Sequence, residues 1–520
     1  IDEDNDRTKN INTFQRRILG LTSYFRSAQE DLLPSFVKTE NDDLYHVIKT
    51  PMTEHQFSVY EAIRKEEADR EKKTTKMKRM QVGKATDMYN ISSTYRIFSR
   101  AACNFTFPPG IVRPIPVIKA DTEVDENVFD AGQNTIRDEV EPDNELEPEP
   151  IVDDSYATRI DHAMKDLNRT HDGNNESLYL SSDALPTYSP KFAKILENIM
   201  DTENEGLHLL YSHFRTMEGI GILRLVFLAN GMAEFKIKRD GDKWTLDIKE
   251  EDIDKPKFVL YTGTETPEEK EIIRNVYNGT WELVPQTIVD KLEERSKNNI
   301  YGEIIKVIMI TSSGAEGINL RNTRFVHIVE PYWHMVRVEQ VVGRARRICS
   351  HQDLPEEMRT VKVFLYVSML SDKQKTDTEN IELRIRDISK VDQKTPVTTD
   401  ESLYEIASAK QRINNEILRA VKETAVDCNI YSALKTGKDV EQYVCYGHGQ
   451  VESNQYSSYP SFEQDVNIKE GLDTTVNKIK AIKKTIDGTD YAMDKNTKKL
   501  YDLESFKRAQ SGLGQALYVG

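Results

Sequence analysis

The chain has 520 residues, a formal net charge of −16 and 38% hydrophobic residues. A chain of this length is expected to form several domains, one of them with a sizeable core. Its longest apolar run, GILRLVFLA, is too short to span a bilayer and contains an arginine, which argues against a membrane protein. The sequence begins without Met and without an apolar signal region, so we expect the protein to start upstream.

The negative charge is concentrated in one segment. Residues 121–154 hold fourteen acidic residues and one arginine, which leaves little net charge for the rest of the chain. The segment is rich in Pro and Glu and poor in large apolar residues, so it cannot bury enough surface to offset the entropy lost on ordering. We therefore predict a disordered insert, either a solvated linker or a regulatory segment that binds a basic partner.

The residues before this insert are predicted to be mainly helical. The pattern over residues 11–60 favours helices punctuated by prolines, and Thr53 and Gln56 have the spacing of a capping box. Residues 61–84 continue as a charged helix with a basic second half. That half is either a solvated surface or a surface for phosphate groups.

From Lys191 onward, short apolar strands alternate with helices. The strands are expected near residues 208, 259, 308, 327 and 364. A helix over GIGILRLVFLA should end at Gly231, residues 239–242 predict a hairpin, and Thr266 should cap a helix that begins at Pro267. This alternation predicts an α/β fold with an open, mostly parallel sheet.

Beyond residue 372 the chain is expected to form accessory structure. An amphipathic helix should begin at Glu401, capped by Thr398, and the tail is expected to form a hairpin around Lys495-Asn496. The four cysteines have no paired spacing, which indicates a reducing compartment, and no set of metal ligands is predicted.

The most informative segment runs from Thr311 to Arg347. Gly314 and Gly317 follow a strand-like run and allow a tight turn whose amides can face an anion. A predicted helix from 338 to 347 then places Gln340, Arg344 and Arg347 on one face, with Gly343 beside it. Alone, each pattern is usually a turn or a solvated helix face. Together, on a strand-loop-strand-helix scaffold, they indicate nucleoside triphosphate chemistry.

This segment resembles motifs V and VI of the superfamily 2 helicases and translocases, T-x-x-x-x-x-G-x-N and Q-x-x-G-R-x-x-R. It is closer to the chromatin-remodeller branch, which has the same spacing of residues equivalent to Gly317, Trp333, Gln340, Arg344 and Arg347. It departs from that branch at His334-Met335 and Cys349-Ser350. With the following SHQDLPEEMRTVKVFLYVS, these departures resemble transcription ATPases of large cytoplasmic DNA viruses, of the early transcription factor and nucleoside triphosphatase I types.

The resemblance implies a RecA-like C-terminal motor lobe whose partner lobe lies outside this chain. No G-x-x-x-x-G-K-[ST] loop and no D-E-x-H pair occurs, so ATP and Mg²⁺ would bind mainly the other lobe, and this chain alone should be inactive. Arg344 and Arg347 would be catalytic, by stabilising charge on the γ-phosphate. The nucleotide would be approached by Gly317, Asn319, Gln340 and Gly343. The nucleic acid would be contacted by Ser212, Thr311, Ser312 and Trp333.

The expected organisation follows from these assignments. The predicted regions are a helical segment 1–60, a helical protrusion 61–118, an acidic insert 119–190, the motor lobe 191–372, a helical accessory region 373–485 and a hairpin-like tail 486–520. The expected partners are DNA or RNA and a viral RNA polymerase or transcription factor subunit, without a membrane. The expected location is intracellular, in a virion or a host cytoplasm.

Two other interpretations remain open. The chain could be a non-catalytic, motor-derived module that docks polymerase or nucleic acid, or another doubly wound domain such as a sugar-nucleotide transferase. The intact set of Gln340, Arg344 and Arg347 favours a motor over a docking module, because docking alone does not require it. Trp333 beside a strand end is as compatible with core packing as with a nucleic-acid contact.

Overall fold

The computed structural model describes residues 11–23, 32–81, 96–115, 154–171, 176–241, 243–263, 265–312, 317–376, 387–428, 445, 481–486, 489–495, 498–510 and 519. They divide into two compact units. The sheet unit spans Arg26–Asn415, and the terminal unit combines Thr8–Phe25 with Glu416–Gly520. The acidic segment predicted at 121–154 lies outside the described residues, except for its last residue.

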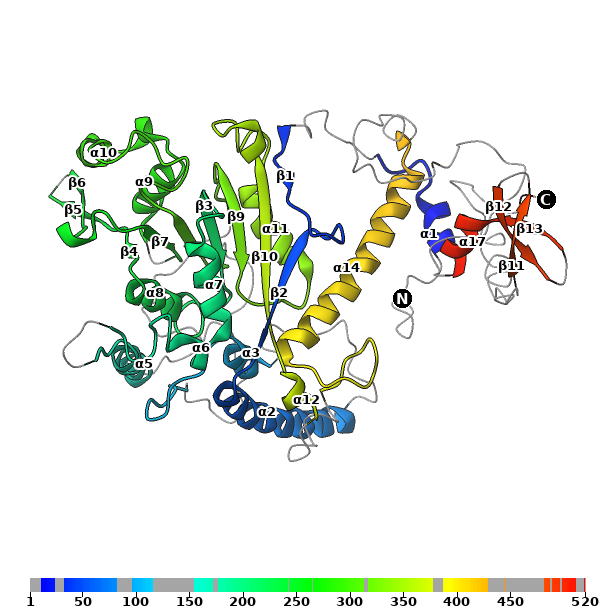
Figure 1. Ribbon diagram of the computed structural model, residues 1–520, viewed down its shortest axis with the longest axis horizontal. Helices are drawn as coiled ribbons and strands as arrows, with labels where there is room; N and C mark the ends of the chain where they lie inside the picture. Colours follow the sequence, from blue (N-terminus) through cyan, green and yellow to red (C-terminus); the bar gives the residue numbers. More distant parts are fainter. Residues whose placement is uncertain are drawn as a thin grey trace. The chain divides into compact units, whose positions relative to one another are not determined.

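An eight-stranded sheet forms the centre of the sheet unit (Figure 1). Its strands are β1 Ser35–Phe36, β2 Tyr45–Pro51, β3 Leu207–Tyr211, β4 Ala233–Glu234, β7 Lys257–Tyr261, β8 Val307–Ile310, β9 Thr323–Ile328 and β10 Thr360–Met369. The order is β1-β10-β9-β3-β8-β7-β4, and β2 also pairs with β10. Every neighbouring pair is parallel. The predicted α/β fold with a mostly parallel sheet is confirmed.

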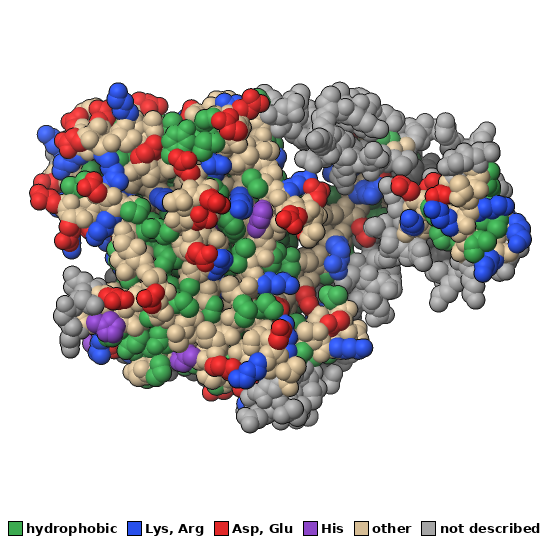
Figure 2. Space-filling view, in the orientation of Figure 1, with side chains coloured by type: hydrophobic (Ala, Val, Ile, Leu, Met, Phe, Trp, Pro, Cys, Tyr) green, Lys and Arg blue, Asp and Glu red, His purple; other side chains and the backbone are tan. Residues whose placement is uncertain are grey.

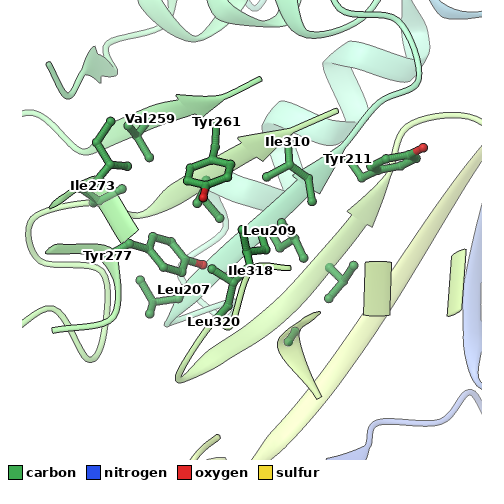
Figure 3. Close-up of a cluster of buried hydrophobic side chains, with 14 of the residues drawn as sticks. Leu207, Leu209, Tyr211, Val259, Tyr261, Ile273, Tyr277, Ile310, Ile318 and Leu320 are labelled. Carbon is green, nitrogen blue, oxygen red and sulfur yellow. The ribbon is translucent and has the colours of Figure 1, made fainter. Parts of the chain in front are cut away.

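Helices cover both faces of this sheet. Successive strand residues point to opposite faces, and both faces carry apolar side chains that the helices bury. One face packs against α9 Pro267–Tyr277, α10 Gln286–Glu293 and α11 Met335–Ala345, and part of this apolar cluster is drawn in Figure 3. The other face packs against α5 Asp154–Leu167, α7 Pro190–Met200 and α8 Ile220–Ala229, near the short α6 Leu185–Tyr188. Within β3, Leu209 belongs to the first cluster and Leu210 to the second. Parallel strands buried on both faces explain the near-continuous apolar runs in the sequence.

The N-terminal part of the sheet unit differs from the expected helices. Residues 32–51 contribute β1 and β2, which pair with β10 from Thr360 to Met369. Among the described residues of 11–60, the α-helices are α1 Ile11–Ile18 and the start of α2 Glu54–Gln81. The expectation was wrong for β1 and β2 because their stabilisation comes from a partner strand more than 300 residues away, which local periodicity does not reveal.

The predicted capping box at the start of α2 is half correct. The Gln56 amide donates to Thr53 Oγ1 at 3.2 Å, as expected of an N-cap. The Gln56 side chain does not return to residue 53. It donates instead to the carbonyls of Ala102 and Cys103, at 3.0 and 3.2 Å, in α3 Ile97–Asn104. These bonds tie α2 to α3.

Part of the predicted insert 119–190 is folded. Helix α5 places Tyr156, Ile160 and Leu167 in the second apolar cluster, each 5% exposed or less. Helix α5 begins at Asp154, so the predicted boundary of the insert at residue 190 was wrong.

Several smaller predictions are confirmed. The hairpin near residues 239–242 is β5 Ile237–Asp240 with β6 Lys243–Leu246. Helix α9 begins at Pro267 with Thr266 as its N-cap. Helix α14 Thr399–Thr424 follows Thr398, whose hydroxyl accepts from the Glu401 amide while Glu401 returns the bond. The remaining short helices of the sheet unit are η2 Glu250–Asp252, η3 Trp281–Leu283, η4 Glu356–Met358 and α12 Asp372–Thr376.

The terminal unit contains a small antiparallel sheet. Its strands are β11 Ala481–Ile486, β12 Thr489–Asp494 and β13 Leu500–Asp502, followed by α17 Leu503–Gln510. The predicted tail hairpin is confirmed by the β12–β13 pair. Cys428 and Cys445 form a disulfide, so the expectation of unpaired cysteines was wrong for these two. Within the described ranges, no helix is both long and apolar enough to cross a membrane.

A chain of buried polar side chains crosses the middle of the sheet. His208 Nδ1 and His327 Nε2 are 3.0 Å apart, and His327 Nδ1 lies 2.9 Å from the Tyr366 hydroxyl. All three side chains are fully buried. Burial lowers the pKa of His327 from 6.5 to about 3, and burial also lowers the pKa of His351 to about 4. Both imidazoles are therefore neutral in the folded protein near neutral pH.

These histidines predict sensitivity to mild acid. Below pH 6.5 the unfolded chain binds protons that the folded chain excludes, so stability is fully present above 6.5 and falls as the pH drops toward the folded pKa values. Between pH 8 and 5 we expect a loss of about 2 kcal/mol for each of His327 and His351. Urea unfolding at a series of pH values measures the loss. His327→Gln should reduce the pH dependence, and His171→Gln, at an exposed histidine, should leave it unchanged. Equal pH dependence in both variants would contradict the prediction.

Candidate functional site

The segment after the glycine-rich loop lies extended on the first face of the sheet. Gly317 is exposed and has a φ of 74°, a conformation that favours glycine, as predicted for a tight turn here. Ile318 and Leu320 are buried in the first apolar cluster, whereas Asn319 and Arg321 are exposed. The alternation anchors the segment by its apolar side and turns its polar side outward.

Helix α11 lies beside this segment and is bonded to it. The Leu320 amide donates to the Arg344 carbonyl at 3.2 Å. The Arg347 guanidinium donates from Nη2 to the Ile318 carbonyl at 2.9 Å and from Nε to the Gly343 carbonyl at 3.3 Å. The structure therefore brings the glycine segment and the arginine segment together, as the motif spacing predicted.

The position of Arg347 corrects one part of the prediction. Helix α11 ends at Ala345, and Arg346 has extended backbone angles of −96° and 90°. Arg347 is therefore beyond the helix and does not share a helical face with Gln340 and Arg344. Arg346 turns away, donating to the Pro34 carbonyl at 2.9 Å and lying over the Phe36 ring. The N-terminal segment that forms β1 thus packs against the end of α11.

Positive charge accumulates where the two segments meet. Burial and the nearby charge of Arg344 both lower the pKa of Arg347, which indicates that the two guanidinium groups are close. Arg344 is half-buried, and its Nε has no hydrogen-bond partner within the described residues. Gln340 and Gly343 are exposed beside it. Two cations with exposed polar groups can hold an anion such as a phosphate.

This arrangement fits a phosphate better than a metal ion. In the part of the chain that the structure describes, no group of three His, Cys, Asp or Glu side chains is placed to hold a metal. The side chains around Arg344 and Arg347 offer donors and no carboxylate cluster, whereas Mg²⁺ prefers oxygen ligands.

Two predicted nucleic-acid contacts lie inside the protein. Ser212 is fully buried, and its hydroxyl donates to the Glu330 carboxylate at 3.1 Å. The Ser212 hydroxyl is therefore bonded inside the protein, and its predicted contact with nucleic acid stays a prediction. Thr311 is 3% exposed and donates to the Thr262 carbonyl at 3.3 Å. Ser312 is half-buried, and Gly314 lies outside the described residues.

Trp333 lies in a cluster of aromatic rings and cations. Its ring is 4.6 Å from the His334 ring, and Lys410 Nζ of α14 is 4.7 Å from its centroid. The indole Nε1 is buried without a hydrogen-bond partner among the described residues. Burial, then the charges of Arg337 and Lys410, lower the pKa of His334. Arg337 and Lys410 therefore create a positive potential around His334 and Trp333. On the face shown in Figure 2, Lys and Arg side chains are interspersed with Asp and Glu.

The sequence did not indicate two polar residues that the structure places here. Asn278, the C-cap residue of α9, bonds to the Asn319 carbonyl, and Lys410, on α14, lies over the Trp333 ring. Each is far along the chain from the residue that it contacts. The Asn278-Gly279 pair signalled only a helix end.

Comparisons with known proteins agree with this geometry. Residues 259–349 match the family described as the helicase conserved C-terminal domain. A protein of Acanthamoeba polyphaga mimivirus named a "Putative ATP-dependent RNA helicase" is 26% identical over 88% of this chain and 51% of its own length. A "Termination factor NPH-I homolog" of African swine fever virus is 30% identical over 46% of this chain and 33% of its own length.

The chain spans about half or less of the length of these relatives. A solved structure of the C-terminal part of the Fun30 ATPase domain matches 73% of this chain and 99% of that one, with a TM-score of 0.32 and 14% identity. The expected resemblance to superfamily 2 helicases, including viral ones, is confirmed by the matched domain and the viral relatives.

Proposed function

We propose that this chain is the C-terminal motor part of a nucleic-acid-dependent ATPase, a helicase or DNA translocase that acts in viral transcription. The observation that carries the proposal is the meeting of the exposed Gly317–Arg321 segment with Arg344 and Arg347 on one side of a parallel sheet. The helicase match over residues 259–349 and the names of the viral relatives support it.

In this proposal, the chain's own part of ATP hydrolysis is electrostatic. The triphosphate and Mg²⁺, bound mainly by another lobe, supply the phosphoryl group and part of its charge neutralisation. Arg344 and Arg347 stabilise the negative charge that develops on the phosphoryl oxygens in the transition state. The bonds from Arg347 to two backbone carbonyls fix the direction of its guanidinium before the reaction. Fixed groups need no reorganisation at the moment of reaction.

The nucleic-acid surface is proposed around Trp333. Trp333 and Lys410 combine an aromatic ring with a cation, which is the combination that binds single strands by stacking and phosphate contact. Arg337 adds a second cation, with its guanidinium carbon 5.9 Å from the Tyr332 ring centroid.

The test is binding of an oligonucleotide to the chain across a salt series. Lys410→Gln should lower the slope of log affinity against log salt by roughly 0.7–0.9, because one phosphate contact is lost. Trp333→Ala should weaken binding by about 1–3 kcal/mol with little change in slope, because stacking carries no charge. Fluorescence anisotropy at several salt concentrations measures both.

Lys373→Gln is the matched control, because Lys373 is a strongly exposed lysine of the same unit that pairs with Glu54 instead. It should change neither slope nor affinity. An unchanged slope in Lys410→Gln together with unchanged affinity in Trp333→Ala would remove this surface from the proposal.

A further inference from the structure

One side chain outside both motif segments, that of Asn278, binds the backbone of the Gly317–Arg321 segment. Asn278 is the C-cap residue of α9. Its Nδ2 donates to the Asn319 carbonyl at 2.9 Å, and its Oδ1 accepts from the Arg321 amide at 2.9 Å. A carboxamide has a donor and an acceptor side by side, so it pairs with a carbonyl and an amide two residues apart, as a parallel strand does.

The segment is thus bound along three sides. Its other edge is tied to α11 through the Leu320 amide and the Ile318 carbonyl. Its inner side is packed, since Ile318 and Leu320 lie beside Leu207 and Tyr277 (Figure 3). With Asn278 in place, the backbone of residues 318–321 has little freedom, and the Asn319 side chain is presented outward.

We propose that Asn278 is a positioning residue for the nucleotide-facing segment. Resting on the proposed ATPase function, the inference is that Asn278 holds residues 318–321 in register with α11, so that Asn319, Arg344 and Arg347 face one ligand. Asn278 is half-buried at a helix end, and it is not part of the apolar cluster on which the segment packs. Its loss is therefore a local loosening and not a loss of the fold.

The chain offers a matched control in Asn230. Asn230 is the C-cap residue of α8 and is also half-buried. Its Nδ2 donates to the carbonyls of Leu180 and Val226, at 2.8 and 2.7 Å. Asn230→Ala therefore removes two side-chain bonds to the backbone at an equivalent helix end, away from the exposed segment.

The experiment compares Asn278→Ala and Asn230→Ala in the full-length protein. Hydrogen exchange of the amides of residues 317–322 should become about tenfold faster in Asn278→Ala and stay unchanged in Asn230→Ala. In steady-state hydrolysis, kcat should fall about tenfold in Asn278→Ala, with KM for ATP changed less than about threefold. Melting temperatures should differ from the parent by only a few degrees in both variants, because the change is local.

Asn278→Asp keeps one of the two bonds and removes the other. A carboxylate can accept from the Arg321 amide, but it cannot donate to the Asn319 carbonyl. It should resemble Asn278→Ala in kcat, and it provides a second variant if the alanine variant folds poorly. Unchanged exchange of residues 317–322 in both Asn278 variants would overturn the inference. Faster exchange with parental kcat in these variants would overturn it as well. If the parent itself hydrolyses no ATP, the proposed function fails, while the exchange data still decide whether Asn278 holds the segment.

Discussion

Arg344→Ala is expected to lower kcat for ATP hydrolysis by the full-length protein on the order of a thousandfold or more. The guanidinium acts on charge that exists in the transition state, so its loss appears in kcat, with only a modest loss of nucleic-acid affinity. Arg347→Ala is also expected to remove most of the turnover, because it deletes a second cation and the bond to the Ile318 carbonyl. Steady-state hydrolysis and oligonucleotide binding measure the two effects.

Arg346→Ala is the control for these variants. Arg346 lies between the two arginines in sequence, yet its Nε donates to the Pro34 carbonyl and its guanidinium covers Phe36. Its replacement should leave kcat near the parental value and affect mainly the packing of the N-terminal segment. Near-parental turnover in Arg344→Ala would show that this residue does not act on the phosphate.

Lys191→Ala is expected to destabilise the sheet unit by about 3–5 kcal/mol. The Lys191 side chain is fully buried, and Nζ lies 2.5 Å from Asp400 Oδ2 and 2.8 Å from Asn104 Oδ1. Without the ammonium group, the buried Asp400 carboxylate has no cation to compensate it. The pair joins the start of α7 to the start of α14, so equilibrium unfolding by urea should report the loss directly.

Lys194→Ala controls for the loss of a lysine from the same helix. The Lys194 side chain is 38% exposed and pairs with Glu197, so its replacement should cost no more than about 1 kcal/mol. The double variant Lys191→Met with Asp400→Asn should recover much of the stability lost in Lys191→Ala, because no uncompensated charge is left inside. Similar stabilities for Lys191→Ala and Lys194→Ala would refute the assigned role of the buried pair.

Strands with a clear local apolar pattern could be predicted from the sequence, whereas strands that depend on a distant partner could not. The strands β3, β7, β8, β9 and β10 were recognised because they are buried on both faces and their sequences are mainly apolar. β1 and β2 were missed because their partner β10 lies more than 300 residues along the chain. The register of Tyr45–Pro51 on β10 is a tertiary property, and the local pattern of polar and apolar residues does not encode it.

The candidate site was predictable in composition and less so in geometry. The spacing of Gly317, Gln340 and Arg344 correctly placed a glycine segment beside a helix. The helix end at Ala345 was not foreseen, so the approach of Arg347 depends on a turn and not on helical periodicity. Asn278 was beyond reach, because its two bonds join residues more than 40 positions apart and leave no pattern in the sequence.

The central claim is that this chain supplies the arginine-bearing lobe of a motor whose hydrolysis depends on nucleic acid. The most direct measurement is steady-state ATP hydrolysis by the full-length protein, with and without DNA or RNA, beside the 520-residue chain alone. We predict turnover that nucleic acid stimulates in the full-length protein and no turnover by the chain alone, which has no phosphate loop. Stimulated turnover by the isolated chain, or hydrolysis by the full-length protein that nucleic acid leaves unchanged, would contradict the claim.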